Sequence, residues 1–538
     1  MTFSALDWAV VAAYFLMIFG VAFWVRAQAS GSRSSADYFL AGRNVGWFVI
    51  GASLFASNIG AEHLVGLAGT GAASGIAVAQ FEILASLILL ILGWVFVPFY
   101  ISSGVFTMPQ FLERRYSKGP RTYLAIISII GYVLTKISVT VAAGGIVFEA
   151  LMGIEFWTGA VIVVVATGIY TLFGGLKAVL YTDMIQMFVL LFGAIMVTVL
   201  GLNAIGGWSA FTAEVDPAML DLWQPMDHPD FPWTGILFGA PILGVWYWCT
   251  DQFIVQRVLS ARSIAEARRG TIFAGFLKQL PLFIFVIPGL IAYVLSQSGQ
   301  LQLDHSDQAL PALIGALLPA GLRGVVAAGL LAALMSSLSS VFNSCATLIS
   351  FDVYKRVRPA ANDRSLIIVG QVSVIVLVLL GLLWIPYMDL ISSRLYTYIQ
   401  SVQAYISPPI AAVFLIGVLW PRANAKGAMA ALAVGFVLGM GRLVMEANSD
   451  ALDGFALVLA TENFLHIAVA LFVVCSMTLV AVSLATQAPS SEQTKGLTFG
   501  QLRDEFRPSM RDKVTRQDIV LTVILLALVA VVWGMFSG

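Results

Sequence analysis

Charged residues are scarce in this chain. Only 11% of its 538 residues are Asp, Glu, Lys or Arg, whereas 59% are hydrophobic. A soluble chain carries about a quarter charged residues, so this composition excludes a soluble enzyme. Lys+Arg and Asp+Glu balance at 29 each, which removes the electrostatic case for a nucleic-acid partner. Three cysteines and four histidines are too few to suggest a disulfide framework or a thiolate metal centre.

Long apolar runs are what the chain has in abundance. A helix needs roughly 20 apolar residues to cross a bilayer, and a search for such runs gives fourteen segments. They cover residues 7–25, 46–70, 80–101, 122–150, 157–173, 179–202, 234–256, 271–297, 322–350, 365–386, 395–419, 427–446, 463–486 and 517–536. We therefore expect one all-α integral membrane domain over residues 1–538, with fourteen transmembrane helices and the lipid bilayer as its surroundings.

The basic residues predict the orientation of these helices. Most of the 29 lysines and arginines fall in alternate connections, and cytoplasmic connections carry such an excess. The opposite connections, such as residues 214–230 and 450–462, are acidic. With an even count of spans, both termini are expected outside, in a multi-pass protein of the plasma (inner) membrane.

Two of the apolar segments look interrupted. The second carries the polar stretch Ser57–His63, and the seventh carries Gly239-Ala240-Pro241 and then Gly244. The two lie five segments apart and so run in opposite directions, as two five-helix inverted repeats that each open with a broken helix require. The repeats would cover residues 46–202 and 234–419, with one additional helix before them at 7–25 and three after them within 427–536. Alternatively, Gly and Pro are simply commoner in membrane helices.

A few ionisable side chains lie inside the apolar segments. Such a residue costs at least about 2.5 to 3.5 kcal/mol near the bilayer centre, so it marks a site or a pathway by default. Lys136 and Lys278 are not loop residues, and Lys278 is predicted to bind substrate or to form an ion pair. Glu62 and His63 lie in the interrupted second segment, where His63 is either a ligand or a satisfied core residue. Glu82, Asp183 and Asp251 lie near segment ends, where a carboxylate can also cap a helix.

The ninth segment is rich in serine. Ser336, Ser339 and Ser340 share one helix face by their spacing. Small hydroxyl residues can simply let helices pack closely. The functional alternative is a Na⁺ site, because serine hydroxyls facing the carbonyl groups of Ala56 and Ile59 would supply the oxygens that a hard cation prefers.

Aromatic and amide side chains complete the candidates. Tyr247 and Trp248 follow the expected break in the seventh segment, where an aromatic face can pack on a sugar ring or simply on other helices. Gln400 and Gln403 are buried amides that need partners. Together with Asn58, His63, Glu82 and Lys278, they supply donors and acceptors suited to a neutral polyol.

At these residues the sequence resembles the solute:sodium symporter family and, within it, the sodium/glucose cotransporters. The matching strings recur in order over nearly the whole chain. They are Ser53–Gly60, His63–Gly75, Gly174–Leu176 with Tyr181–Asp183, Trp246–Gln252 continuing into Gln256-Arg257, and Ala333–Ser337. The resemblance implies a LeuT-type core of two five-helix inverted repeats with extra helices at both ends.

The resemblance also implies site residues, position by position. One Na⁺ would be held by the carbonyl groups of Ala56, Ile59 and Ala333 and the hydroxyls of Ser336 and Ser337. The sugar would be held by Asn58, His63, Glu82, Lys278 and Gln400, with Trp248 beside it and Tyr247 stacking beneath it as the inner gate. The outer gate would be Leu67, Phe81 and Tyr396. A possible second Na⁺ site would use Asp183, Ser339 and Ser340.

The implied function is symport and not enzymatic catalysis. Na⁺ would drive uptake of a monosaccharide such as glucose or galactose by alternating access. Gly244, Ile83 and Gln403 depart from the family's pattern and bear on which sugar is preferred. The alternatives are Na⁺-coupled transport of an inositol, a sialic acid or an amino acid, and a sugar-gated channel or sensor without accumulation. A homo-oligomer is compatible with the sequence.

Overall fold

The computed structural model of the chain describes residues 3–27, 34–60, 62–303, 305–388, 395–499 and 514–537. Within these ranges the regular structure is helical, apart from the isolated β-bridges Val45–Ala261 and Gln224–Pro232.

The helices of the first half include several with π-helical turns, labelled η. They are α1 (Ala5–Ala27), α2 (Ser35–Leu40), α3 (Trp47–Asn58), η2 (Glu62–Leu67), α4 (Ala68–Ser74), α5 (Gln80–Ile91), η4 (Leu92–Phe96), α6 (Val97–Ser103), α7 (Met108–Arg115), α8 (Lys118–Gly131), η5 (Tyr132–Ile137), α9 (Ser138–Val147), η6 (Phe148–Met152), α10 (Phe156–Ile205) and α11 (Trp208–Glu214).

The second half continues in the same way. Its helices are η8 (Gly235–Gly239), α12 (Ala240–Gly244), η9 (Val245–Thr250), α13 (Gln252–Leu259), α14 (Ile264–Leu277), η10 (Leu282–Val286), α15 (Ile287–Gln297), α16 (Ala309–Leu317), α17 (Leu322–Leu348), η12 (Ile349–Tyr354), α18 (Lys355–Val357), α19 (Asp363–Met388), α20 (Leu395–Leu419), α21 (Ala425–Ala447), α22 (Gly454–Thr461), α23 (Phe464–Ala485), α24 (Ser491–Thr494) and α27 (Arg516–Met535).

Eleven helices in the described ranges are long and apolar enough to cross a membrane, or twelve if the bent pair α3 and η2–α4 is one span. Two shorter apolar helices cover Phe156–Leu172 and Gly235–Thr250. Each of the fourteen predicted segments overlaps one of these helices. The chain is therefore an all-α multi-pass membrane protein, while the count of fourteen crossings and the inverted repeat stay predictions.

The first predicted interruption is confirmed and the second is displaced. Helix α3 ends at Asn58, Ile59 is extended (φ −71°, ψ 104°), and the chain resumes at a bend of 65°. In the seventh segment, however, the chain stays helical from Gly235 to Thr250, and Pro241 lies just after the π-helical turn η8, which accommodates it within the helix. The chain becomes extended only at Asp251 (φ −75°, ψ 131°), so the prediction of a break at residues 239–244 is wrong.

Glycine makes the turn between the fifth and sixth predicted segments. Helix α10 bends at Gly175, which has a φ of 62°. A Cβ there would lie 2.6 Å from the carbonyl oxygen of Tyr38, so both the backbone conformation and the close approach of α2 require glycine.

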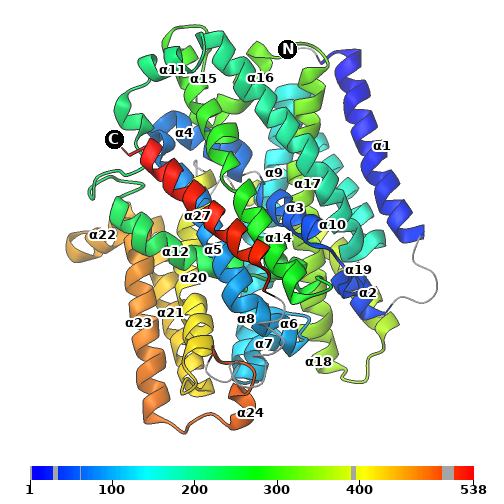
Figure 1. The fold of residues 1–538 in the computed structure, drawn as a ribbon, viewed down its shortest axis with the longest axis vertical. Helices are drawn as coiled ribbons and strands as arrows, with labels where there is room; N and C mark the ends of the chain where they lie inside the picture. Colours follow the sequence, from blue (N-terminus) through cyan, green and yellow to red (C-terminus); the bar gives the residue numbers. More distant parts are fainter. Residues whose placement is uncertain are drawn as a thin grey trace.

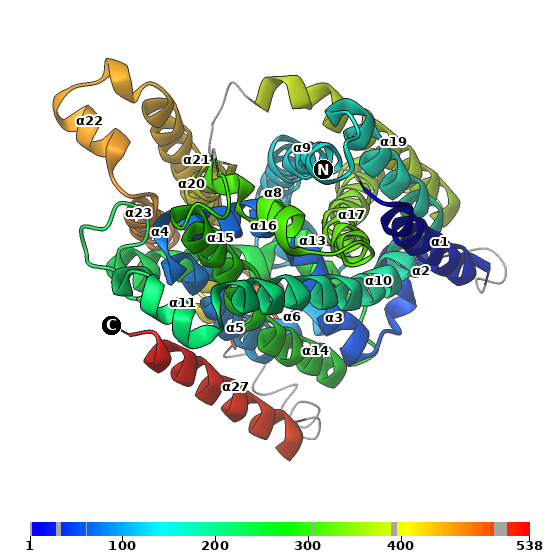
Figure 2. The ribbon, with the colours of Figure 1, turned by 90° about the horizontal axis from the view of Figure 1, so that it is seen from above.

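The helices at the centre of the bundle are buried, and those at its rim expose apolar side chains. Helix α17 packs along α10 and is almost entirely buried, whereas α1 and α27 lie at the edge of the bundle, as Figure 2 shows, and are mostly exposed. The connections near α7, α18 and α24, which carry many of the basic residues, lie at the lower end of Figure 1, and α11 and α16 lie at the upper end. We therefore expect a binding site for solute and ion in the buried centre of the bundle.

Candidate functional site

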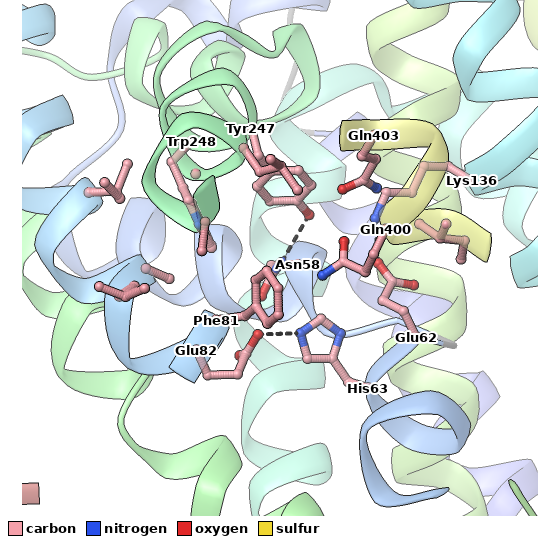
Figure 3. Close-up of a pocket in the computed structure, with 17 residues that line it drawn as sticks. Asn58, Glu62, His63, Phe81, Glu82, Lys136, Tyr247, Trp248, Gln400 and Gln403 are labelled. Atoms are coloured by element: carbon pink, nitrogen blue, oxygen red, sulfur yellow. Dashed lines mark hydrogen bonds and ion pairs between the residues drawn. The ribbon is translucent and has the colours of Figure 1, made fainter. Parts of the chain in front are cut away.

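A cavity opens where the break after α3 meets α5, η5, η9 and α20. Figure 3 shows the polar side chains that face it, together with Phe81 from α5 and Tyr247 and Trp248 from η9. The lining residues are Asn58, Glu62, His63, Phe81, Glu82, Leu84, Ala85, Ile88, Lys136, Ala240, Leu243, Gly244, Tyr247, Trp248, Ile399, Gln400 and Gln403. The structure therefore brings together most of the residues that the resemblance assigns to the sugar.

Asn58 occupies the last position of α3, where the helix break leaves its side chain free to reach across the cavity. Its amide nitrogen donates to the hydroxyl of Tyr247 at 2.9 Å, and its amide oxygen accepts from the ammonium group of Lys278. Asn58 therefore connects the proposed gate residue Tyr247 to the charged side of the cavity.

Glu82 pairs with two basic side chains. Its Oε1 lies 3.1 Å from Nε2 of His63, and its Oε2 forms an ion pair with Lys278. The Lys278 side chain is fully buried and its ammonium nitrogen lies 5.5 Å from the centre of a Trp248 ring. Lys278 thus supports the wall from behind, because it does not itself line the cavity. Glu82 therefore forms ion pairs at the cavity and does more than cap a helix. Asp251, in contrast, does cap α13, because its side chain accepts from the Phe253 N–H.

The structure contains a second buried ion pair at the cavity, and its two residues were not predicted as site residues. Glu62 Oε1 pairs with the ammonium group of Lys136, which also lies 5.1 Å from the centre of the Tyr247 ring. The position of Lys136 in the middle of an apolar segment was the available signal. The sequence could not show that the interrupted second span would place Glu62 opposite it.

The predicted gate residues are not all at the cavity. Tyr247 and Phe81 line it, and the Tyr247 ring packs edge-on against Trp248 and Phe253. Leu67 is fully buried and is absent from the lining. The side chain of Tyr396 lies outside the part of the structure that can be described.

Some of the residues predicted for the first Na⁺ site lie close together. The Ser337 hydroxyl lies 2.9 Å from the carbonyl oxygen of Ser57 and 3.2 Å from that of Ile59, at the unwound end of α3. Ala56 and Ala333 are buried in the same helices α3 and α17. Ser336 instead turns away and donates to Asp183 Oδ1 at 2.6 Å. Ser337 and the α3 carbonyl groups thus offer neutral oxygens of the kind that a Na⁺ substrate prefers.

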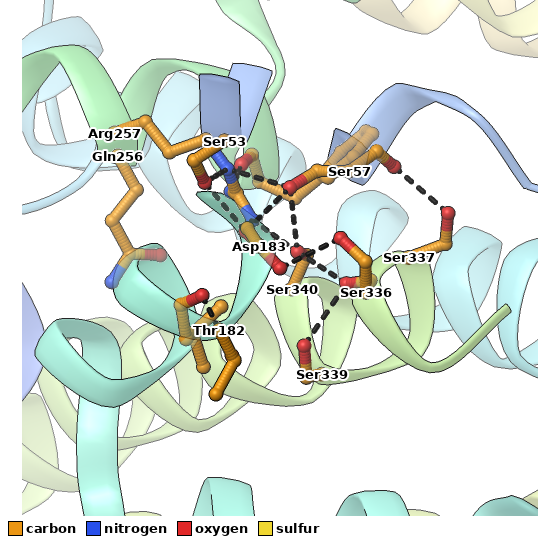
Figure 4. A network of polar contacts seen from close by, with 12 residues as sticks. Ser53, Ser57, Thr182, Asp183, Gln256, Arg257, Ser336, Ser337, Ser339 and Ser340 are labelled. Atoms are coloured by element: carbon orange, nitrogen blue, oxygen red, sulfur yellow. Dashed lines mark hydrogen bonds and ion pairs between the residues drawn. The ribbon is translucent and has the colours of Figure 1, made fainter. Parts of the chain in front are cut away.

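Asp183 lies at the centre of an enclosed cluster of hydroxyl groups, shown in Figure 4. Its Oδ2 accepts from Ser53 and from Ser57 at 2.9 Å, and it faces the guanidinium group of Arg257 at 3.4 Å. Asp183 is fully buried, nine residues inside the span that begins at Gly174, so a role as a simple helix cap is wrong.

The other residues of the possible second Na⁺ site lie beside this cluster. The Ser340 hydroxyl contacts Ser57 at 3.0 Å and also Arg257, whereas the Ser339 hydroxyl donates to the carbonyl oxygen of Ser336 at 3.0 Å. Arg257 directly follows the predicted segment 234–256, so the sequence predicts it in a basic connection. It is instead a fully buried residue of α13, because the chain re-enters a helix directly after Asp251.

The chain is similar to known proteins over most of its length. A family model described as the Sodium:solute symporter family matches residues 38–435. The chain is 37% identical over 527 residues to sodium/glucose cotransporter 1 of Oryctolagus cuniculus, covering 90% of this chain and 79% of that protein. It is 39% identical over 541 residues to the sodium/myo-inositol cotransporter of Homo sapiens, covering 92% and 75%.

A solved structure shares the fold. The substrate-bound, outward-open state of a Na⁺-coupled sialic acid symporter aligns with a TM-score of 0.79 at 21% identity, covering 90% of this chain and 99% of that chain. The family match spans well over half of the chain, and the two relatives exceed 30% identity over most of their length. The chain therefore belongs to the sodium:solute symporter family: it is a transporter with sodium as its coupling ion, and not an enzyme.

Proposed function

We propose that this chain couples inward movement of Na⁺ to uptake of a neutral monosaccharide, such as glucose or galactose, by alternating access. One observation carries the choice of a neutral substrate. Each acidic side chain of the cavity wall already has a cationic partner, Glu82 with Lys278 and Glu62 with Lys136.

A carboxylated or cationic substrate would find no unpaired counter-charge among these residues. Burying a charge without a partner is costly, whereas hydroxyl groups can exchange hydrogen bonds with amides and paired charges. Asn58, Gln400 and Gln403 supply such amides around the cavity. The paired charges and the three amides therefore favour a polyhydroxylated neutral solute over a sialic acid or an amino acid.

Tyr247 supplies the apolar side of the site. Its ring lies in the cavity wall while its hydroxyl is held by Asn58. An aromatic face packs well on the C–H surface of a pyranose ring, and the amides and the Glu82–Lys278 pair then face the hydroxyl groups. Phe81 would close over the same space from α5.

Na⁺ binding would favour the state that accepts the sugar. An ion bound by Ser337 and the α3 carbonyl groups joins α17 to the broken second span, and the coupling between ion and sugar is reciprocal. One ion moving through about 100 mV and down a tenfold gradient releases roughly 3.7 kcal/mol, which supports roughly 500-fold accumulation.

The proposal extends to a second Na⁺ held by Asp183, Ser339 and Ser340. Arg257 would have to withdraw from Asp183 before the carboxylate could bind the ion. The ratio of ²²Na⁺ flux to labelled sugar flux is the measurement. We expect a ratio near two in the wild type and near one in Ser339→Ala, and a wild-type ratio near one would end this part of the proposal.

The proposal also covers the sidedness of the termini and the inverted-repeat topology. With the basic connections in the cytoplasm, both termini lie outside the plasma (inner) membrane. Residues 46–202 and 234–419 would form the two inverted repeats, because both opening spans are interrupted, at Ile59 and at Asp251. Cysteine labelling of single-cysteine variants at the exposed positions Ala5 and Ser537 would contradict this orientation if both were modified from the cytoplasm only.

The substrate is tested by uptake into proteoliposomes. Labelled glucose, galactose, myo-inositol, sialic acid and an amino acid are compared with and without an inward Na⁺ gradient. We expect Na⁺-dependent uptake of a hexose that unlabelled hexoses inhibit. The myo-inositol arm is needed because relatives at 39% identity carry that solute, and stronger uptake of myo-inositol would replace the hexose as the substrate.

A further inference from the structure

The two carboxylate oxygens of Glu62 have different neighbours. Its Oε1 holds Lys136, as described above. A Cβ on Gly60 would lie 2.7 Å from Glu62 Oε2 and 2.9 Å from Ser337 Oγ. The second carboxylate oxygen and the Ser337 hydroxyl thus face the same small gap beside Gly60, which stays open because residue 60 has no side chain.

That gap adjoins the neutral oxygens of the first Na⁺ site. Ser337 already contacts the carbonyl oxygens of Ser57 and Ile59. A nearby carboxylate strengthens the binding of a hard cation more than another neutral oxygen does. Glu62 is not among the Na⁺ ligands that the family resemblance implies.

Lys136 leads from Glu62 to the substrate cavity. Its ammonium nitrogen lies 5.1 Å from the centre of the Tyr247 ring and 5.7 Å from that of Phe253. Lys136 lines the cavity together with Gln400 and Gln403, and Figure 3 shows the three side chains next to each other and to Glu62. The ammonium group therefore has the Tyr247 ring and the amides beside it as alternative neighbours to the carboxylate.

We infer that Glu62 is shared between Lys136 and the Na⁺ bound at Ser337, so that this ion pair transmits Na⁺ binding to the sugar site. A cation beside Ser337 attracts the Glu62 carboxylate and repels the Lys136 ammonium group. Lys136 then moves its interaction toward Tyr247, Gln400 and Gln403, which changes the surface that the sugar meets. This inference rests on the proposed Na⁺–sugar symport and adds a positioning pair to it.

The two residues of this pair should affect Na⁺ binding in opposite directions. If Lys136 competes with Na⁺ for Glu62, loss of the Lys136 charge must tighten Na⁺ binding, whereas loss of the Glu62 charge must weaken it. A purely structural ion pair predicts no such opposition, because removal of either partner only leaves an unpaired buried charge.

The test is ²²Na⁺ binding to the purified full-length protein in lipid nanodiscs without sugar. We expect Lys136→Gln to lower the half-saturating Na⁺ concentration at least about fivefold and Glu62→Gln to raise it at least about fivefold. In the Glu62→Gln background, Lys136→Gln should have no further effect, because the shared carboxylate is gone. Lys136→Arg keeps the charge and should stay within about twofold of the wild type.

Arg442→Gln is the matched control. Arg442 also pairs with a carboxylate, Glu446 at 3.0 Å, and lies 5.2 Å from the centre of a tyrosine ring, that of Tyr405, but it is not part of the cavity wall. Its loss should leave Na⁺ affinity unchanged. The double variant Glu62→Gln/Lys136→Gln removes both charges together and so keeps the test usable if a single variant folds poorly.

The outcomes separate this inference from the proposed function. If the wild type shows no Na⁺-driven sugar uptake, the proposed function fails. If the wild type transports, but Lys136→Gln weakens Na⁺ binding or leaves it unchanged, the shared-carboxylate inference alone is overturned. A tighter Na⁺ affinity in Lys136→Gln with a reduced effect of sugar on that affinity is the result that supports it.

Discussion

Two buried carboxylates in this molecule have different surroundings. Glu82 pairs with His63 and Lys278 and lines a cavity on its remaining side. Asp183 is enclosed by serine hydroxyls and by Arg257, and it has no exposed surface. Both satisfy the rule that a buried charge needs partners, yet only Glu82 can meet a ligand without a rearrangement.

The difference separates a binding wall from a locked cluster. A carboxylate with one open side can exchange hydrogen bonds with a solute while its ion pair stays intact. An enclosed carboxylate binds an ion only after a neighbour leaves. Substitutions around Glu82 should therefore act on substrate affinity as well as on stability, because Lys278 also loses its counter-charge, whereas substitutions around Asp183 should act mainly on stability.

The largest effect is expected when the enclosed cluster loses its acid. Asp183→Ala leaves the Arg257 guanidinium group buried without its counter-charge, which should lower the free energy of unfolding by about 3 to 5 kcal/mol. The measurement is unfolding of the purified protein in a denaturing detergent. Asp450→Ala, an exposed acid, serves as the control and should unfold like the wild type. An Asp183→Ala protein as stable as the control would contradict the description of the cluster as locked.

Substitutions in the cavity wall should lower the affinity for the sugar. Glu82→Ala and Gln400→Ala should each weaken sugar binding by about 10- to 100-fold, the equivalent of about 1 to 3 kcal/mol, because buried polar groups lose their partners. Na⁺ binding without sugar should persist in both variants. Binding of labelled sugar at saturating Na⁺ is the measurement, with the exposed Gln300→Ala as control. Normal transport by both variants would place the sugar elsewhere.

A smaller effect is expected at the boundary between the two clusters. Ser337→Ala deletes the hydroxyl that faces the carbonyl groups of Ser57 and Ile59, so the apparent Na⁺ affinity should fall about five- to tenfold. The sugar affinity at saturating Na⁺ should change little. Ser373→Ala removes a hydroxyl that donates to Val369 within α19 and is the matched control. Unchanged Na⁺ affinity in Ser337→Ala would remove this serine from the site.

The smallest effect is expected from removal of a single hydroxyl group in the cavity wall. Tyr247→Phe loses only the hydroxyl that accepts from Asn58, so it should cost about 1 kcal/mol of sugar affinity and keep most transport. Tyr247→Ala also loses the ring face and should be far worse. Initial uptake rates of the two variants give the comparison. Equal defects would argue against stacking of the sugar on Tyr247.

The sequence could predict the elements and most of the wall, because both depend on local signals. Apolar runs mark the helices, and polar residues inside those runs point to Asn58, His63, Glu82 and Lys278. The break at Ile59 was equally visible in the polar residues that follow it. Glycine and proline were a poorer guide in the seventh span, since helical turns tolerated them and the chain opened at Asp251 instead.

What could not be predicted are the partners that the fold supplies from distant segments. Arg257 is close in sequence to Arg262, Arg268 and Arg269 near the end of the seventh span, but it reaches Asp183 in space. Glu62 and Lys136 are 74 residues apart, and only the bend in the second span places one opposite the other. Ion pairs of this kind depend on helix packing, which neither hydropathy nor spacing encodes.

Coupling between the cation and the neutral solute is the central claim, and steady-state accumulation tests it most directly. Proteoliposomes are given an inward tenfold Na⁺ gradient and an inside-negative potential of about 100 mV, and the internal concentration of labelled hexose is measured once uptake stops. This coupling predicts accumulation far above the external concentration, with a limit of roughly 500-fold for one coupled Na⁺ and the square of that value for the two Na⁺ proposed above, and equilibration when the gradients are collapsed. Entry that stops at equal concentrations despite intact gradients would contradict it and would identify a channel.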